Sequence, residues 1–142
     1  MLFVCVENAC RSLMAEAMFN ARPPDGWRAF SAGTEPARSP NPRTGPMLEE
    51  IGLALPPHPP RMLTAAMIDA AEIVVTMGCL DHDRCPARLS ARGPRDWALP
   101  DPARLEDDGF RRVRRELYDR VGALIAELGR AEGVPSPTAA GR

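Results

Sequence analysis

Residues 2–12 read Leu2-Phe3-Val4-Cys5-Val6-Glu7-Asn8-Ala9-Cys10-Arg11-Ser12. The apolar run at the start of this segment predicts a β-strand. Residues 13–19 are good helix formers, and serine is a residue type that caps helix N-termini, so Ser12 is predicted to open a helix. The strand therefore delivers Cys5 into a tight loop, and Arg11 closes that loop just before the helix begins.

This order of strand, loop and helix predicts a binding site for an oxyanion, with a nucleophile at its floor. The loop turns backbone N–H groups toward one point, and the helix dipole adds partial positive charge there. Arg11 adds a planar bidentate guanidinium. The other predicted oxyanion-binding residues are Asn8, Cys10 and Ser12. The same positive field favours the Cys5 thiolate, with a pKa in the roughly 3.5 to 7.5 range of activated cysteines.

Two alternatives concern the cysteines of this loop. Cys5 could be an inert residue of a buried strand, with Arg11 on the surface. Cys10 could be a reserve thiol that protects Cys5 by forming a disulfide within the loop, or a passive buried cysteine.

Size and composition predict one domain. The chain has 142 residues, 44% of them hydrophobic, with a formal net charge of −1, and all of its basic side chains are arginines. We expect a single domain over residues 1–129 and a flexible tail over residues 130–142. No apolar run approaches the roughly 18 residues that span a bilayer, and no signal sequence is visible. We therefore expect a cytoplasmic monomer that binds a small anion, with no nucleic-acid or membrane partner.

The rest of the chain alternates predicted strands and helices, which indicates an α/β fold. Its predicted segments are a strand at 28–33, a helix from Asn41-Pro42 to 51, a helix at 65–71, a strand at 73–76, a long loop at 77–94, a strand at 96–99 and a helix through 110–128. We expect three α/β/α layers around a central four-stranded parallel sheet. Ligands of such sheets bind at the carboxyl ends of the strands, where Cys5, Thr76 and Asp101 are expected.

Two more thiols, Cys79 and Cys85, lie in the predicted loop after the third strand. A thiol that attacks a Cys5 adduct, and is then attacked in turn, needs such a loop and a neighbouring cysteine. The competing hypothesis is a metal site, because His82 lies midway between the two cysteines. A structural zinc site requires a fourth ligand, so we favour redox chemistry and predict no metal site.

Asp101 follows a predicted strand end, where a carboxylic acid could protonate a leaving oxygen. Aspartate is also common in turns, so Asp101 alone is weak evidence. His58 lies between prolines and is predicted to be a loop residue rather than a catalytic one.

These motifs together resemble the low-molecular-weight protein tyrosine phosphatase family, and within it the thiol-coupled arsenate reductases. The resemblance extends to about Gly129. It rests on residues 3–17, Ser31-Ala32-Gly33-Thr34, Asn41-Pro42, Arg61-Met62-Leu63-Thr64, residues 74–79, Cys85-Pro86, Asp96-Trp97, Asp101-Pro102-Ala103 and residues 110–116.

The resemblance implies that Cys5 attacks arsenate, that Arg11 and the loop amides hold the oxyanion, and that Asp101 is the general acid. Cys79 would then attack the Cys5 adduct, releasing arsenite and leaving a Cys5–Cys79 disulfide. Cys85 would take over Cys79, and thioredoxin would reduce the resulting disulfide. No bound cofactor is implied, and the spacing of Cys79 and Cys85 leaves a small thiol open as the reductant.

The thiols also argue for a reductase independently of the resemblance. Hydrolysis needs one thiolate and a water molecule, whereas reduction of arsenic(V) by two electrons consumes a pair of thiols. In the tyrosine phosphatases that the chain resembles, aromatic residues follow the Asp-Pro pair, and this chain carries Ala103-Arg104 there instead. The alternatives are a phosphatase acting on phosphotyrosine or a small phosphomonoester, and a thiol or metal sensor.

Potassium is a further implication of the resemblance, since some members hold it near the oxyanion loop. The threonine and aspartate that they use are missing around 59–61, which leaves Asn8, Glu16 and Ser31 as candidate ligands.

Overall fold

Four short strands form one parallel sheet, as the sequence predicts. The computed structural model describes residues 1–78 and 85–133. The strands are β1 (Leu2–Cys5), β2 (Phe30–Gly33), β3 (Val74–Thr76) and β4 (Arg95–Asp96), in the spatial order β2-β1-β3-β4. The apolar run that precedes the Cys5 loop thus becomes a central strand, paired in parallel on both sides.

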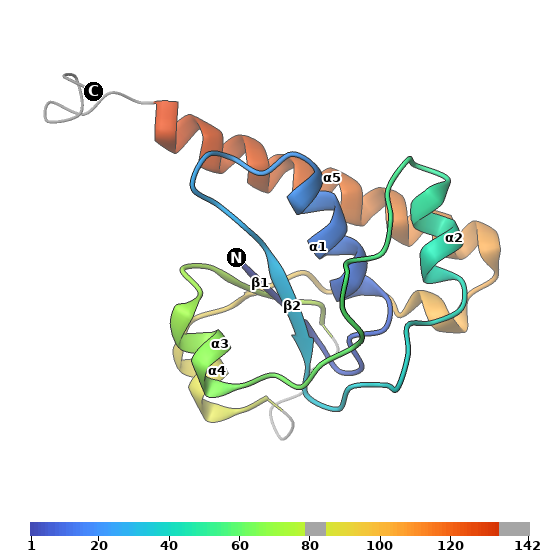
Figure 1. Ribbon diagram of the computed structural model, residues 1–142, viewed down its shortest axis with the longest axis horizontal. Coiled ribbons are helices and arrows are strands. Elements are labelled where there is room, and N and C mark those ends of the chain that lie inside the picture. The colour runs from blue at the N-terminus through green and yellow to red at the C-terminus, as the bar shows by residue number, and fades with distance from the viewer. Residues whose placement is uncertain (79–84, 134–142) are drawn as a thin grey trace, which may run out of the picture.

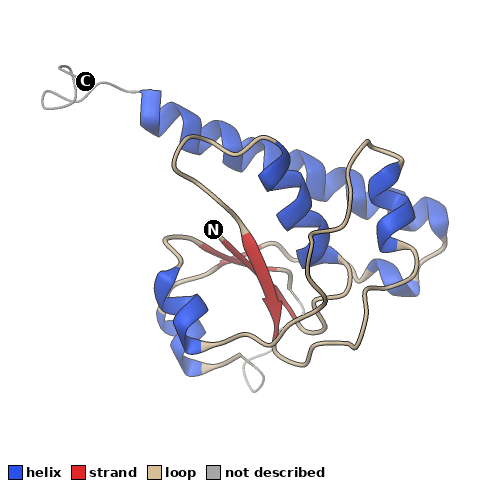
Figure 2. Cartoon of the chain, viewed as in Figure 1, coloured by secondary structure: helices blue, strands red, loops and turns tan. Residues whose placement is uncertain are grey.

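Helices cover both faces of this sheet, which gives the predicted three layers (Figures 1 and 2). The helices are α1 (Arg11–Ala21), α2 (Thr44–Glu49), α3 (Ala65–Ala70), α4 (Ala87–Ala91), the short 3-10 helix η1 (Pro102–Arg104) and α5 (Asp107–Gly133). Phe3 and Val75 face a core that α1 and α5 close, and Leu2 and Val4 face a second core that α3 and α4 close. Both faces of β1 are therefore buried, as is usual for parallel strands.

The strand order places a topological switch point beside Cys5. The chain leaves β1 through α1 on one face, and it leaves β3 toward α4 on the opposite face. Two neighbouring loops that diverge in this way leave a crevice at the carboxyl ends of their strands. The loop from Cys5 to Arg11, called the oxyanion loop below, borders this crevice on one side, and Met77 and Gly78 follow β3 on the other.

Several element boundaries differ from the predicted ones. β4 ends at Asp96 instead of Leu99, because its partner β3 ends at Thr76 and the chain after it turns at Gly78, which has a φ of 75°. α2 begins at Thr44 instead of Asn41, since the Asn41 side chain accepts the Arg43 N–H and forms a turn.

The last helix is longer than predicted. α5 continues to Gly133, so residues 130–133 of the expected flexible tail belong to its last turn. Residues 134–142 of that tail lie outside the described part of the chain. Within the described residues, no helix combines the length and apolar character needed to cross a membrane.

Gly33, at the end of β2, generates the first prediction. A Cβ built there would lie 2.4 Å from the Val6 carbonyl oxygen and 2.9 Å from the Asn8 nitrogen, both backbone atoms of the oxyanion loop. We expect Gly33→Ala to lower the free energy of unfolding by about 1–3 kcal/mol, because the loop must shift to admit the methyl group. Urea denaturation of the purified variant measures this change.

Gly122→Ala is the matched control. Gly122 lies within α5, and a Cβ added there would meet no described atom within 4 Å apart from the nearby backbone of its own helix. Alanine should raise the free energy of unfolding there by about 0.5–1 kcal/mol, because alanine has the higher helix propensity. Equal stability changes for the two variants would contradict the close packing of β2 against the loop.

Candidate active site

The oxyanion loop turns its carbonyl groups away from the crevice. The carbonyl oxygens of Cys5, Val6, Glu7 and Ala9 accept hydrogen bonds from the backbone N–H groups of Thr34, Glu35, Ala37 and Asn41, at 3.3, 2.8, 2.9 and 2.9 Å. Asn8 adopts a left-handed conformation with a φ of 51°, which asparagine tolerates better than most residues. A loop whose carbonyls are bound on the outside presents its amides on the inside, where an anion can be held.

Cys5 lies at the base of this loop and is 3% exposed. Its sulfur accepts the backbone N–H of Asn8 at 3.2 Å and lies 2.9 Å from the Ser12 hydroxyl oxygen. Hydrogen bonds donated to a sulfur favour its ionised form. The structure thus places Cys5 where a nucleophile is expected.

Arg11 is a buried cation at the edge of the crevice. Its Nη1 donates to the carbonyl oxygens of Met77 at 3.2 Å and Leu99 at 2.7 Å, which come from segments far along the chain. Among the described residues, no carboxylate lies within ion-pair distance of this guanidinium. A buried charge normally requires an opposite charge nearby, so Arg11 indicates a site for a bound anion.

Cys5 and Arg11 share one cavity of about 680 Å³. Its lining residues are Cys5, Val6, Glu7, Ala9, Cys10, Arg11, Glu35, Asn41, Gly78, Leu99, Pro100, Asp101, Ala103 and Arg104. No aromatic side chain is found among these described residues, which suits a small anion better than a substrate ring.

Asp101 lies on the wall of this cavity, at the start of η1. Its Oδ1 accepts the Ala103 N–H at 3.0 Å, which fixes the carboxyl group beside the helix N-terminus. The predicted acid therefore shares the cavity with the predicted nucleophile.

Arg43 holds the Asp101 segment in place, a role that sequence reasoning missed. Its guanidinium donates to the carbonyl oxygens of Pro102, Ala103 and Leu105 at 3.1, 3.2 and 2.8 Å. It also lies 4.9 Å from the centroid of the Phe110 ring. Arg43 follows the Asn41-Pro42 motif, but the local sequence contains no signal for partners about sixty residues away.

Asn8 and Ser12, two of the predicted oxyanion-binding residues, are buried behind the loop and are not among the described residues that line the cavity. The prediction that Ser12 caps α1 is wrong, because the helix begins at Arg11 with Cys10 at the N-cap position and no side-chain cap. The Ser12 hydroxyl is bound instead to Asn8 and Cys5.

Cys85 lies just before α4, on the other face of the sheet. It is partly buried against the second core, and its sulfur accepts the Ser90 hydroxyl at 3.1 Å. Cys85 is not one of the described residues that line the cavity, so the structure does not bring it together with Cys5. Cys79 and His82 lie outside the described residues. Elsewhere in the described chain, no group of three His, Cys, Asp or Glu side chains could hold a metal ion.

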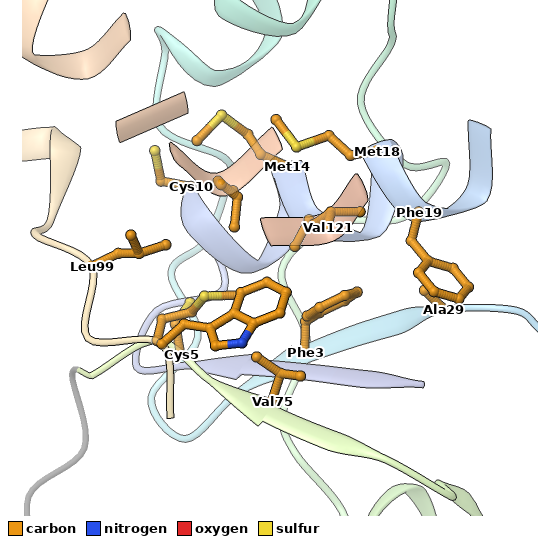
Figure 3. Packing of buried hydrophobic residues seen from close by; sticks show 14 of the residues in the cluster. Phe3, Cys5, Cys10, Met14, Met18, Phe19, Ala29, Val75, Leu99 and Val121 are labelled. Atoms are coloured by element: carbon orange, nitrogen blue, oxygen red, sulfur yellow. The ribbon is translucent and has the colours of Figure 1, made fainter. Parts of the chain in front are cut away.

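Cys10 is buried on the α1 side of the cavity, next to Met14 (Figure 3). Burial raises the pKa of its thiol to about 12, although a hydrogen bond with Thr44 opposes the rise. Because disulfide chemistry requires a thiolate, a thiol with this pKa is a poor partner for Cys5 at neutral pH. Because Cys10 also lines the cavity with Cys5, its role, protective or passive, stays a prediction.

Comparison with known proteins gives concordant matches. The model of the low molecular weight phosphotyrosine protein phosphatase family matches residues 1–133. An arsenate reductase of Halalkalibacterium halodurans is 34% identical over 134 residues, covering 90% of this chain and 95% of that protein. The crystal structure of an arsenate reductase from Archaeoglobus fulgidus aligns with a TM-score of 0.73 at 33% identity, over 88% of this chain and 98% of that one. A thioredoxin-dependent arsenate reductase of Corynebacterium glutamicum aligns with a TM-score of 0.73 at 31% identity, over 92% of this chain and 61% of that one.

Cys10 generates a prediction about stability at high pH. An unfolded cysteine ionises with an ordinary pKa of 9.0, whereas the native Cys10 thiol holds its proton until about pH 12. Above pH 9.0 the unfolded chain therefore binds fewer protons than the native one, and stability falls as the pH rises. We expect the free energy of unfolding of Cys10→Ala to fall less steeply with pH than that of the wild type, by up to about 1.4 kcal/mol per pH unit. Urea denaturation of both proteins at several pH values above 9 measures the difference, and identical slopes would contradict a buried neutral thiol.

Proposed function

We propose that this chain, which belongs to the low molecular weight phosphotyrosine protein phosphatase family, reduces arsenate to arsenite through Cys5. One observation carries the proposal. The buried Arg11 guanidinium opens onto the same cavity as the Cys5 sulfur, and its described partners are carbonyl oxygens only. Arsenate is a tetrahedral oxyanion that the loop amides and a planar guanidinium would hold together.

The first step joins substrate and protein. The Cys5 thiolate attacks arsenic and a sulfur–arsenic bond forms, while one arsenic–oxygen bond breaks and a hydroxyl group of arsenate leaves as water with a proton from Asp101. The carboxyl group of Asp101 lies on the cavity wall, which supports this role as general acid. Arsenic is still pentavalent in the adduct.

The second step is the reduction. In sequence, Cys79 directly follows Gly78, which lines the cavity. The Cys79 thiolate attacks the Cys5 sulfur, a disulfide forms, and the sulfur–arsenic electron pair passes to arsenic, which leaves as arsenite. Two thiols are thereby oxidised as one arsenic atom is reduced.

The third step restores Cys5. Cys85 attacks the Cys79 sulfur, which frees the Cys5 thiolate and leaves a Cys79–Cys85 disulfide. Thioredoxin, or a small thiol, then supplies two electrons to reduce this disulfide, so the scheme requires no bound cofactor. Cys85 attacks Cys79 and not Cys5, so this step does not need Cys85 to leave the second core and line the cavity. We place the reaction in the cytoplasm, where such reductants occur, and assign it to the monomer.

A phosphatase is the second candidate, because the same loop, Arg11 and Asp101 would also suit hydrolysis of a phosphomonoester. The names of the similar proteins favour reduction, since they include arsenate reductases above 30% identity and one that is thioredoxin-dependent. The described cavity lining also lacks an aromatic wall for a tyrosine ring.

Arsenate-dependent consumption of NADPH, coupled through thioredoxin and thioredoxin reductase, tests this proposal. We expect steady turnover in the wild type and its loss in both Cys79→Ser and Cys85→Ser. Cys85→Ser should still release a single burst of arsenite, because the first disulfide forms without Cys85. Replacing thioredoxin with a small thiol identifies the reductant.

Glu127→Gln is the control for these substitutions, because Glu127 pairs with Arg95 on the surface and does not line the cavity, and it should keep steady turnover. Two results together would favour the phosphatase. Cys79→Ser would hydrolyse an aryl phosphate at the wild-type rate, and arsenate would cause no NADPH consumption with the wild type.

A further inference from the structure

Two glutamates lie at the anion cavity and have no role in the scheme above. Glu7 belongs to the oxyanion loop and Glu35 follows β2, and both residues line the cavity that Cys5 and Arg11 share. Both are exposed, and within residues 1–78 and 85–133 neither carboxylate forms an ion pair. A carboxylate in this place opposes the binding of a bare oxyanion, because like charges repel over a few ångströms.

The backbone holds the two glutamates, called the acidic wall below, on the same side of the cavity. The Glu35 N–H donates to the Val6 carbonyl oxygen at 2.8 Å, and the Ala37 N–H donates to the Glu7 carbonyl oxygen at 2.9 Å. The segment after β2 therefore runs along the oxyanion loop and carries one glutamate next to the other. Because hydrogen bonds fix the backbone at both positions, the acidic wall is built into the fold.

Arg11 indicates a ligand at this cavity independently of the glutamates. It is 8% exposed, and both of its described hydrogen bonds are made by Nη1. Within the described residues Nε and Nη2 have no hydrogen-bond partner, although every fully enclosed side-chain nitrogen there has one, so these two nitrogens open onto the cavity. Donors of a buried cation that lack a protein acceptor require a bound anion.

The charges around the cavity are therefore unevenly placed. Its described lining carries three carboxyl groups and two guanidinium groups. The segment around η1 contributes one group of each sign, Asp101 and Arg104, whereas the acidic wall contributes two carboxylates and no cation. A ligand that places its anion on Arg11 thus meets negative charge on one side, unless the ligand itself carries a positive charge there.

We propose that this cavity also binds phosphomonoesters that carry an ammonium group, and that Glu7 and Glu35 select them over esters without a positive charge. The phosphoryl group lies on the loop amides and Arg11, and the ammonium group lies against the acidic wall. Each glutamate then attracts the ligand instead of repelling it. The proposal concerns binding only, so it and arsenate reduction can fail separately.

Protection of Cys5 against alkylation by iodoacetamide, followed by mass spectrometry of the Cys5 peptide, measures this preference. The probes are 2-aminoethyl phosphate and propyl phosphate, which have the same length and differ by an ammonium group in place of a methyl group. We expect 2-aminoethyl phosphate to halve the alkylation rate at an about three- to tenfold lower concentration, because each exposed ion pair adds up to about fivefold. Equal concentrations for the two probes would overturn the proposal.

Glu7→Gln and Glu35→Gln keep the shape of each side chain and remove its charge. Each should reduce the preference by about two- to threefold, and the double variant should abolish it. Propyl phosphate should protect the variants at a lower concentration than the wild type, because the repulsion is gone, whereas a purely structural role would weaken both probes. A preference that persists in the double variant would overturn the assignment.

Glu49→Gln is the matched control, because Glu49 is an exposed glutamate of α2 that does not line the cavity. It changes the net charge by the same amount, so its ratio of protecting concentrations should equal that of the wild type. A loss of preference in this control equal to that in the cavity variants would contradict a local role of the acidic wall.

Two measurements on the wild type test the proposal without any substitution. Raising sodium chloride from about 0.02 M to about 0.5 M should shrink the preference, because salt screens exposed charges, and a preference that does not change would overturn the electrostatic origin. Carboxymethyl phosphate, which carries a carboxylate in place of the ammonium group, should protect Cys5 less well than propyl phosphate. Better protection would mean that Arg104 dominates the cavity mouth, and would overturn the proposal.

Discussion

The bonds from Arg11 Nη1 to the Met77 and Leu99 carbonyl oxygens hold the rest of the site together. They tie the start of α1 to the segment after β3 and to the segment before Asp101, across 66 and 88 residues of chain. A buried guanidinium bonded to carbonyls keeps its full positive charge, since carbonyls satisfy its hydrogens without neutralising it. The same residue therefore closes the fold around the crevice and supplies the charge that an anion needs.

Two supports hold the reacting groups in place from opposite sides. On one side, Arg43 donates to three carbonyl acceptors around η1 and so fixes the segment that carries Asp101. Behind the oxyanion loop, hydrogen-bonded side chains from Glu16 to Ser12 fix the environment of Cys5. Both supports use charged side chains on backbone or buried acceptors, where hydrogen bonds are strong and geometrically strict. The residues that we propose to react are thus held in their geometry before a substrate arrives.

Local signals predict one part of this structure, and packing decides the rest. An apolar run followed by Cys5, a short loop and good helix formers predicts β1, the oxyanion loop and α1, because each signal depends on near neighbours.

The helix cap predicted at Ser12 is wrong because its hydroxyl binds Cys5 and Asn8 instead, and helix propensity says nothing about that competition. β4 ends early because its partner β3 ends at Thr76, and the propensity of a segment says nothing about where its partner strand stops. Long-range pairs leave no periodic or local trace, since His58 lies 42 residues from Glu16 and Arg43 lies 59 residues from Pro102. His58 is a loop residue, as predicted, but its ring reaches a buried carboxylate that only the folded chain places there.

The most direct test is a single turnover without an external reductant. Fully reduced protein is mixed with excess arsenate, and the released arsenite is separated by chromatography and counted per chain, together with the thiols that remain. If Cys5 passes oxidation to neighbouring thiols, one arsenite forms for each chain and two thiols disappear. No arsenite, with every thiol intact, would contradict a reaction centred on Cys5.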